Sequence, residues 1–396
     1  MKKKFIVHFD EFTEPMKNRI IFSKDSIYLE QGDLSDAEFE REKQIFADFL
    51  KSQAEKYNTD DNSDKETKPH MKNVKITRAK TFYSPKDKPT RAIFGLLEDF
   101  DNSIFFNQQN QEENGVVRLP VGKTKKGEEV KTSIQINIDE LLKNDNITLS
   151  RELTPFDRAV HDAVISLIVA KNDCFYDNEL FRTIAGYSRY DDRPAPPTIK
   201  KAIQESLKKM SLIRVRVNAT QEAEKMNYPG LKQLKRAIFE NYLLPLKEVE
   251  IEFSNGETVE GYRLLDTPPL YACAGAKKHM LGCDMQHLKL PETIEATPQA
   301  IVIRNYLLEQ IEIMKKSEKK NSGIHRNSNI IFDTLYKVLD VQGDKKDNDS
   351  IVKKRKWQAR STVEELLKAW KESGYILGHE SILEGRKITG VAILLS

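Results

Sequence analysis

The sequence predicts an α+β protein in which three helices followed by a strand and a β-hairpin occur twice along the chain. Three observations support this prediction. Apolar residues recur at helical spacing after Thr154-Pro155 and again after Thr297-Pro298. Strand-like alternation follows the third helix in both cases. An Asn255-Gly256 turn joins two alternating segments, which is a strong local signal for a hairpin. This order of elements is typical of winged-helix domains, so two of them are expected in tandem.

Composition limits the class of protein. The chain has 396 residues, of which 39% are hydrophobic and 32% charged, enough for two or three domains with ordinary cores. No run of about 18 apolar residues occurs, so no membrane-spanning helix is expected. The apolar stretch after the lysines at the start is too short for a signal peptide. Three cysteines, Cys174, Cys273 and Cys283, are too few for a disulfide framework. A cytoplasmic protein is therefore expected.

The N-terminal part is expected to contain two segments. Residues 1–70 form a polar extension, with a short helix over 34–57 and a flexible linker over 58–70, because little in them can be buried. Residues 71–149 are expected to be β-rich, since isoleucines alternate with polar residues over 134–138. The sequence assigns no fold to this region, which we expect to pack on the domain that follows.

The first module, residues 150–296, begins with a clear helix start. Thr154 is a suitable N-cap, Pro155 suits the first helical position, and Asp157 places an acid in the first turn. A second helix is expected to be capped by Asp177 and to end near Gly186. The expected elements are a helix from 154, helices over 177–185 and 197–210, a strand over 212–217 and a hairpin over 249–265.

The second module, residues 297–396, repeats this order without detectable sequence identity to the first. A polar loop is expected over 315–323, and Gly374 is expected to end the third helix. The expected elements are helices over 297–314, 329–339 and 350–373, and strands over 375–377 and 388–395 around Glu384-Gly385.

The distribution of charge indicates a nucleic-acid partner more clearly than its total. The net charge is only +3, but residues 196–236 contain ten Lys/Arg against three acids, and residues 353–371 contain seven against two. Local basic stripes are what contact with phosphate requires. The alternative is that both stripes are ordinary solvated helix faces.

Candidate DNA-contacting residues lie on the third helix of each module. In the helix over 197–210 they oppose the apolar face, with Lys209 beside them, and are Lys200, Lys201, Gln204 and Lys208. In the helix over 350–373 they share one face, and are Lys353, Lys356, Trp357 and Arg360. Lysine can bond guanine or phosphate, and glutamine can pair with adenine. Arg386 and Lys387 lie at the predicted tip of the second hairpin. The alternatives are a solvated face for the first helix, and a core position for Trp357 with incidental lysines for the second.

The sequence also resembles a known family. The segment from Leu153 to Val160 (LTPFDRAV), following the strand over 134–139, resembles the entry to the first winged helix of plasmid replication initiators. The segment from Thr198 to Met210 resembles the third helix of that domain, and the second module resembles their second winged helix. The resemblance covers residues 130–396 and is one of pattern. It implies binding of double-stranded DNA at origin repeats, switching between monomer and homodimer, and contact with host replication proteins.

No enzymatic motif is complete, so no catalytic residue or cofactor is expected. The segment from Val121 to Thr124 imitates the end of a phosphate-binding loop, but position 117 is valine where that loop needs glycine. No pair of histidines has the His-x-His spacing of rolling-circle nicking enzymes, and no histidine has the His-x-x-Arg spacing of tyrosine recombinases. His161, on the polar flank of the helix from 154, is expected to be structural.

A metal site is the weaker of two interpretations for one group of residues. Cys273, His279, Cys283 and His287 lie within fifteen residues and are zinc-ligand types. The close Cys-x-x-Cys pairing of zinc sites is missing, and Cys273 is expected to be a small buried residue after a strand at Tyr271-Ala272. No metal is expected.

Three functions remain open from the sequence. The first is a replication initiator of a plasmid or other mobile element, the second a winged-helix transcriptional regulator or partition protein, and the third a scaffold whose winged helices bind proteins. The basic third helices favour the first two, and the resemblance favours the first.

Overall fold

The chain divides into two compact units, Met1–Lys68 and Pro69–Ser396. In the first unit, strand β1 (Ile20–Phe22) pairs antiparallel with β2 (Ile27–Leu29). The helix predicted over 34–57 lies outside the described residues. The computed structural model describes residues 20–22, 27–29, 69–72, 74–97, 100–105, 116–123, 127–138, 152–187, 193–225, 236–318, 329–341 and 348–395.

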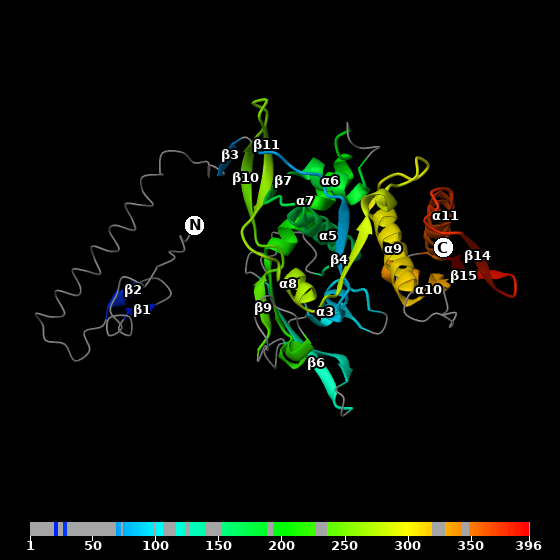
Figure 1. The fold of residues 1–396 in the computed structure, drawn as a ribbon, viewed down its shortest axis with the longest axis horizontal. Coiled ribbons are helices and arrows are strands. Elements are labelled where there is room, and N and C mark those ends of the chain that lie inside the picture. The colour runs from blue at the N-terminus through cyan, green and yellow to red at the C-terminus, as the bar shows by residue number, and fades with distance from the viewer. Residues whose placement is uncertain are drawn as a thin grey trace, which may run out of the picture. The chain divides into compact units, whose positions relative to one another are not determined.

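The second unit mixes helices with small sheets, which confirms the α+β class (Figure 1). Within the described residues, no helix is both long and apolar enough to cross a membrane. Before the first module come β3 (His70–Lys72), β4 (Thr81–Pro85), α3 (Lys88–Ile93), η2 (Asn102–Phe105), β5 (Val116–Lys123) and β6 (Glu129–Ile138). His70, predicted as the end of the linker, is therefore in a strand.

The first module contains the predicted helices and hairpin. Its helices and strands are α5 (Pro155–Val169), β7 (Cys174–Phe175), α6 (Asp177–Ala185), α7 (Pro197–Ser211), β8 (Ile213–Asn218), η4 (Thr220–Lys225), β9 (Ile238–Tyr242), β10 (Leu246–Glu252), β11 (Thr258–Leu264), α8 (Pro269–Ala276), β12 (Met280–Asp284) and η5 (Met285–Leu288). The Thr154 side chain and the Asp157 backbone and carboxylate form a capping box at α5. The N-cap of α6 is Tyr176 and not Asp177, which is the first helical residue. Gly186 ends α6 with φ 84°.

Two sheets connect the N-terminal β-rich region to the first module. In one, the strand order is β5-β6-β8-β9, and β6 places Ile134 opposite Val217 of β8. In the other, the order is β3-β10-β11-β7, and only β3 is parallel to its neighbour. A separate pair joins β4 to β12. The predicted packing of this region on the first module therefore occurs through backbone pairing.

The second module consists of α9 (Pro298–Glu318), β13 (Asn329–Ile331), α10 (Phe332–Val338), α11 (Asp349–Glu372), β14 (Gly378–Glu384) and β15 (Lys387–Leu394), with the sheet order β13-β15-β14. Three predicted boundaries are wrong. The first turn of the helix expected over 329–339 is strand β13, which pairs with β15. The strand expected over 375–377 is a turn after Gly374, in which Tyr375 and Ile376 bond to Trp370. Helix α9 continues through Lys315 into the expected loop.

Helix α5 is the centre of the second unit. It packs against β4, α6, α7 and α9, and nearly all of its residues are buried, polar ones included. His161 was predicted on a polar flank, but it is fully buried, with Nδ1 3.1 Å from Asp162 Oδ1 and its ring against Phe94. A helix enclosed on all sides must find partners within the protein for most of its polar groups. Among the described residues, His161 Nε2 has no hydrogen-bond partner.

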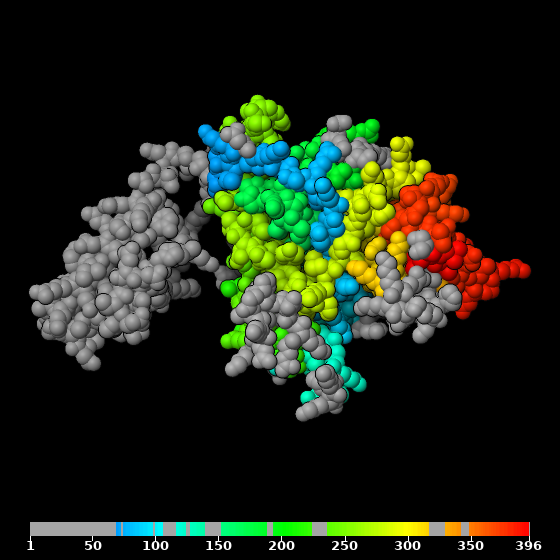
Figure 2. All heavy atoms as spheres, in the orientation of Figure 1, coloured from blue at the N-terminus to red at the C-terminus, as the bar shows by residue number. Residues whose placement is uncertain are grey.

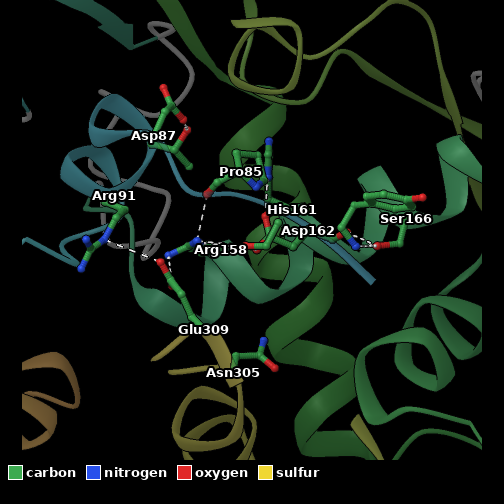
Figure 3. Close-up of polar contacts among 12 residues, drawn as sticks. Pro85, Asp87, Arg91, Arg158, His161, Asp162, Ser166, Asn305 and Glu309 are labelled. Atoms are coloured by element: carbon green, nitrogen blue, oxygen red, sulfur yellow. Dashed lines mark hydrogen bonds and ion pairs between the residues drawn. The ribbon is translucent and has the colours of Figure 1, made fainter. Parts of the chain in front are cut away.

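A buried ionic network provides those partners between α5 and α9 (Figure 3). Arg158 of α5 donates to Glu309 Oε2 of α9 at 3.0 Å, and its Nε lies 3.4 Å from Asp162 Oδ2. The same guanidinium donates to the Pro85 carbonyl of β4 at 2.9 Å. Arg91 Nε approaches Glu309 Oε1 at 3.7 Å. One arginine therefore links β4 to the first helix of each module.

Arg304 of α9 makes a second buried connection and has no exposed surface. Its guanidinium donates to the carbonyl of Ile184 at 2.7 Å and to the carbonyl of Leu288 at 2.6 Å. A cation at the C-terminal end of α6 is favoured by the helix dipole and satisfies a carbonyl left free there. Gly186 lies at the same junction, where a Cβ atom would be 2.5 Å from the Leu288 carbonyl carbon.

We expect Gly186→Ala to lower the free energy of unfolding by about 2–5 kcal/mol, because it combines left-handed backbone strain with a steric clash. Gly374→Ala is the matched control, since Gly374 has φ 73° but no neighbour among the described residues within 4 Å of the position that a Cβ would take. That control should lose only about 1–2 kcal/mol. Denaturant unfolding measures both. If both variants lost the same free energy of unfolding, the close approach of Gly186 to Leu288 would not contribute to the cost of the substitution.

The buried carboxyl group of Asp87 is expected to make the stability of the fold depend on pH (Figure 3). It is buried, Oδ1 accepts a 2.6 Å hydrogen bond from Thr90, and Oδ2 has no hydrogen-bond partner among the described residues. Burial raises its pKa, partly offset by the Thr90 hydroxyl and Lys277. A raised folded-state pKa favours the folded state at low pH, and this contribution disappears as pH rises from the unfolded to the folded pKa. We therefore expect Asp87→Asn to raise the melting temperature, relative to wild type, more at pH 8 than at pH 4. A difference independent of pH would contradict this.

Candidate nucleic-acid interface

Helix α7 presents a polar face opposite its buried one. Ile199, Ile203, Leu207 and Met210 are buried against the core, which follows from their helical spacing. The predicted contact residues lie on the other side and are all exposed: Lys200, Lys201, Gln204 and Lys208. The structure thus brings these four side chains to one surface.

Two acids contact part of this surface. Asp177, at the start of α6, accepts a 2.7 Å hydrogen bond from Gln204 Nε2 and lies 3.7 Å from Lys200 Nζ. Lys201 is 3.8 Å from Glu205, with 78% of its side chain exposed. Ion pairs this exposed contribute about 0–1 kcal/mol, so phosphate can replace them. Gln204 is more restricted, because pairing with adenine requires it to release Asp177.

Lys209 does not belong to the exposed face. It is 6% exposed, and its ammonium lies 2.8 Å from Asp157 Oδ2 and 3.0 Å from the Glu152 carbonyl. The prediction that it flanks the contact residues is wrong. The reason is its position one residue past Lys208, which turns it toward the capped start of α5.

Helix α11 presents a second cationic surface. Lys353 is exposed and Trp357 is 64% exposed, so the alternative that Trp357 is a core residue is wrong. Lys356 and Arg360 are half-buried. Lys356 lies over the Tyr336 ring at 5.1 Å, and Arg360 Nε donates to the Lys356 carbonyl at 3.4 Å. Of the four predicted residues, Lys353 and Trp357 are the most accessible.

The hairpins of the two modules differ in charge. Between β14 and β15, Gly385 adopts φ 63° and leaves Arg386 and Lys387 exposed at the tip, as predicted. The β10–β11 hairpin is acidic, with five glutamates against two basic residues over 246–264: Glu248, Glu250, Glu252, Glu257 and Glu260. Glu250 and Glu260 are directly opposite each other, an arrangement that like charges disfavour. The alternating glutamates are visible in the sequence, so the acidic character of this hairpin could have been predicted from it.

The candidate zinc ligands do not converge. Cys273 follows no strand and lies inside helix α8, which corrects the prediction, and Cys283 is on β12. His287 stacks on Tyr375 with ring centroids 4.0 Å apart. Burial raises the pKa of both thiols to about 12, which opposes the thiolate form that zinc needs. Among the described residues, no group of three or more ligand-type side chains is arranged to hold a metal.

Comparisons with known proteins add little. No known protein family matches the sequence, and no curated protein matches it. Among solved structures, the chain is similar to two crystal structures of domains 2 and 3 of RctB, at 11% and 10% sequence identity. Both similarities cover 70% of this chain, and they cover 90% and 89% of the RctB chains, with TM-scores of 0.31 and 0.32. These TM-scores are below the level at which two folds are taken to be the same.

Proposed function

We propose that this protein binds double-stranded DNA in a sequence-specific way and initiates replication of a plasmid or other mobile element at origin repeats. In this proposal it is not an enzyme, and each module is a winged helix whose third helix, α7 or α11, enters the major groove. The observation that carries the proposal is that both helices turn cationic side chains to the surface, opposite their buried faces.

The order of elements supports the winged-helix part. In each module a short strand precedes the second helix and pairs with the last strand of the hairpin: β7 with β11, and β13 with β15. Backbone pairing therefore connects the hairpin of each module to the strand that precedes its second helix. This order and pairing of elements supports the proposal that each module is a winged helix.

The chemistry of the surfaces supports DNA as the partner. Lys201 and Lys208 can each neutralise a phosphate or bond a guanine, and Lys353 offers the same from α11. Trp357 is a large exposed apolar surface between cations, suited to packing against sugar or base. Arg386 and Lys387 extend the second module's contact to the backbone.

We expect Lys201→Ala/Lys208→Ala to weaken binding to a labelled mixed-sequence duplex about tenfold at low salt. For each phosphate that the variant no longer neutralises, the slope of log affinity against log salt should fall in magnitude by about 0.9. Lys353→Ala/Lys387→Ala should have a similar effect through the second module. Fluorescence anisotropy over a range of salt concentrations measures both quantities.

The matched control is Lys247→Ala/Lys289→Ala, which removes two exposed lysines that lie outside α7, α11 and the hairpin of the second module. This control should bind as wild type does. If both test variants also bind as wild type does, the two helices are not the DNA-contacting surfaces. Absence of duplex binding by the wild-type protein would refute the whole proposal.

Replication is tested separately from binding. A plasmid whose only origin is the DNA flanking this gene should be maintained in cells that produce the wild-type protein and disappear from cells that produce Lys201→Ala/Lys208→Ala. If maintenance does not depend on the protein although the duplex is bound, a transcriptional regulator becomes the better interpretation.

A further inference from the structure

An extended segment before β4, residues 74–80, crosses the surface of the first module (Figures 1 and 2, where it is blue). We call it the strap. It contains no helix or strand, and side chains of the module hold its backbone. Asn172 binds Thr77 twice, accepting from its N–H at 2.7 Å and donating to its carbonyl at 2.8 Å. The Tyr187 hydroxyl accepts from the Ala79 N–H at 3.2 Å. Asn172 and Tyr187 are buried, so the strap is fixed in place.

The outer side of the strap is cationic. Lys75, Arg78 and Lys80 are exposed, whereas Ala79 between them is buried. The Arg78 guanidinium lies 5.2 Å from the centroid of the Tyr187 ring, a contact that holds it at the surface. Lys171, after the end of α5, is also exposed and has φ 67°.

Three of these cations border an open hollow of about 320 Å³, lined by Arg78, Lys80 and Lys171 together with hydroxyl groups such as those of Thr77 and Tyr83. Among the described residues that line it, none is acidic. Guanidinium, ammonium and hydroxyl donors without a carboxylate are the chemistry that binds phosphate. The hollow is therefore suited to an anion.

The length of the strap favours a polyanion over a single phosphate. From Lys75 to Lys80 the chain extends over roughly 17 Å, at about 3.3 Å per residue. Duplex DNA carries one phosphate charge per about 1.7 Å of its axis, so several phosphates can face the strap at once. A free phosphate would use only one end of it.

The hairpin of the first module also lacks an exposed basic pair at its tip like Arg386 and Lys387, which the second module has beside Glu384. Its β10–β11 hairpin carries five glutamates against two basic residues, and this net negative charge disfavours contact with a DNA backbone. His70 of β3 offsets part of it, lying 2.6 Å from Glu252 and 3.7 Å from Glu250. The strap leaves this hairpin directly, because β3 pairs with β10 and Val74 N–H bonds to the Glu252 carbonyl. Lys72 of β3 lies opposite Glu252 of β10, and the strap continues the run of basic residues from there with Lys75, Arg78 and Lys80.

We propose that the strap and Lys171 form a second DNA-contacting surface, which binds backbone phosphates of a duplex and replaces the hairpin as the phosphate contact of the first module. This inference rests on the proposed function. In this inference the strap increases the affinity for DNA by binding phosphates, and α7 contacts the bases that give sequence specificity. The competing explanation is that Lys80 and Lys171 stabilise the C-terminal end of α5 through its helix dipole.

The test compares Lys80→Gln/Lys171→Gln with the control Lys247→Gln/Lys289→Gln in the full-length protein. Both variants remove two exposed lysines and keep most of each side chain. The probe is a labelled mixed-sequence duplex, and affinity is measured against salt. We expect the strap variant to bind about tenfold more weakly at low salt, with a slope smaller by about 1.8, while the control matches wild type. The melting temperature of the strap variant should equal that of wild type.

Each other outcome has a definite meaning. If the wild-type protein binds the duplex and only the α7 variant has a lower affinity for it, the strap proposal is wrong and the proposed function stands. If the strap variant is weakened and the α7 variant is not, the strap stands and the role of α7 falls. A lower melting temperature with unchanged affinity would assign Lys80 and Lys171 to the stability of α5 and overturn the proposal.

Discussion

The buried ion pair between Arg158 and Glu309 is the contact on which the arrangement of the two modules depends. It joins the first helix of each module at 3.0 Å, in a region from which water is largely excluded. Removing one member of such a pair leaves a buried charge without a partner, which typically costs about 3–5 kcal/mol. Arg304 adds a second buried cation at the same junction, bonded to two carbonyl groups of the first module. The third helices and hairpins are positioned by elements that these contacts hold.

The two modules share an order of elements but differ in how charge is distributed over them. In the second module, cations occupy both the third helix and the tip of the hairpin. In the first, the helix is cationic and the hairpin is acidic. Cations occur instead on the strap, which belongs to the N-terminal region and is held by Asn172 and Tyr187. A region that is separate from the first module in the sequence thus contributes exposed cations to the surface of that module.

Local sequence signals predicted the helices well, because each has a physical cause close in the chain. The capping box at Thr154, the left-handed Gly186 and the Asn255-Gly256 turn all depend on neighbouring residues. Errors occurred where a distant contact decided the outcome. Residues 329–331 form a strand because β15 offers them backbone partners. Cys273 lies in a helix that was not predicted from the sequence, and Lys209 is buried because Asp157, far away in the chain, accepts its hydrogen bond.

The sequence by itself determined the α+β class, the positions of the main helices and the exposed lysines of α7, since these follow from periodicity and from residues a few positions apart. Tertiary structure alone decided that α5 is enclosed, that its polar side chains connect two modules, and that the strap crosses the first module. The physical reason is that burial and ion pairing are properties of residues that meet in space. Arg158 and Glu309 are 151 positions apart, and no local pattern relates them.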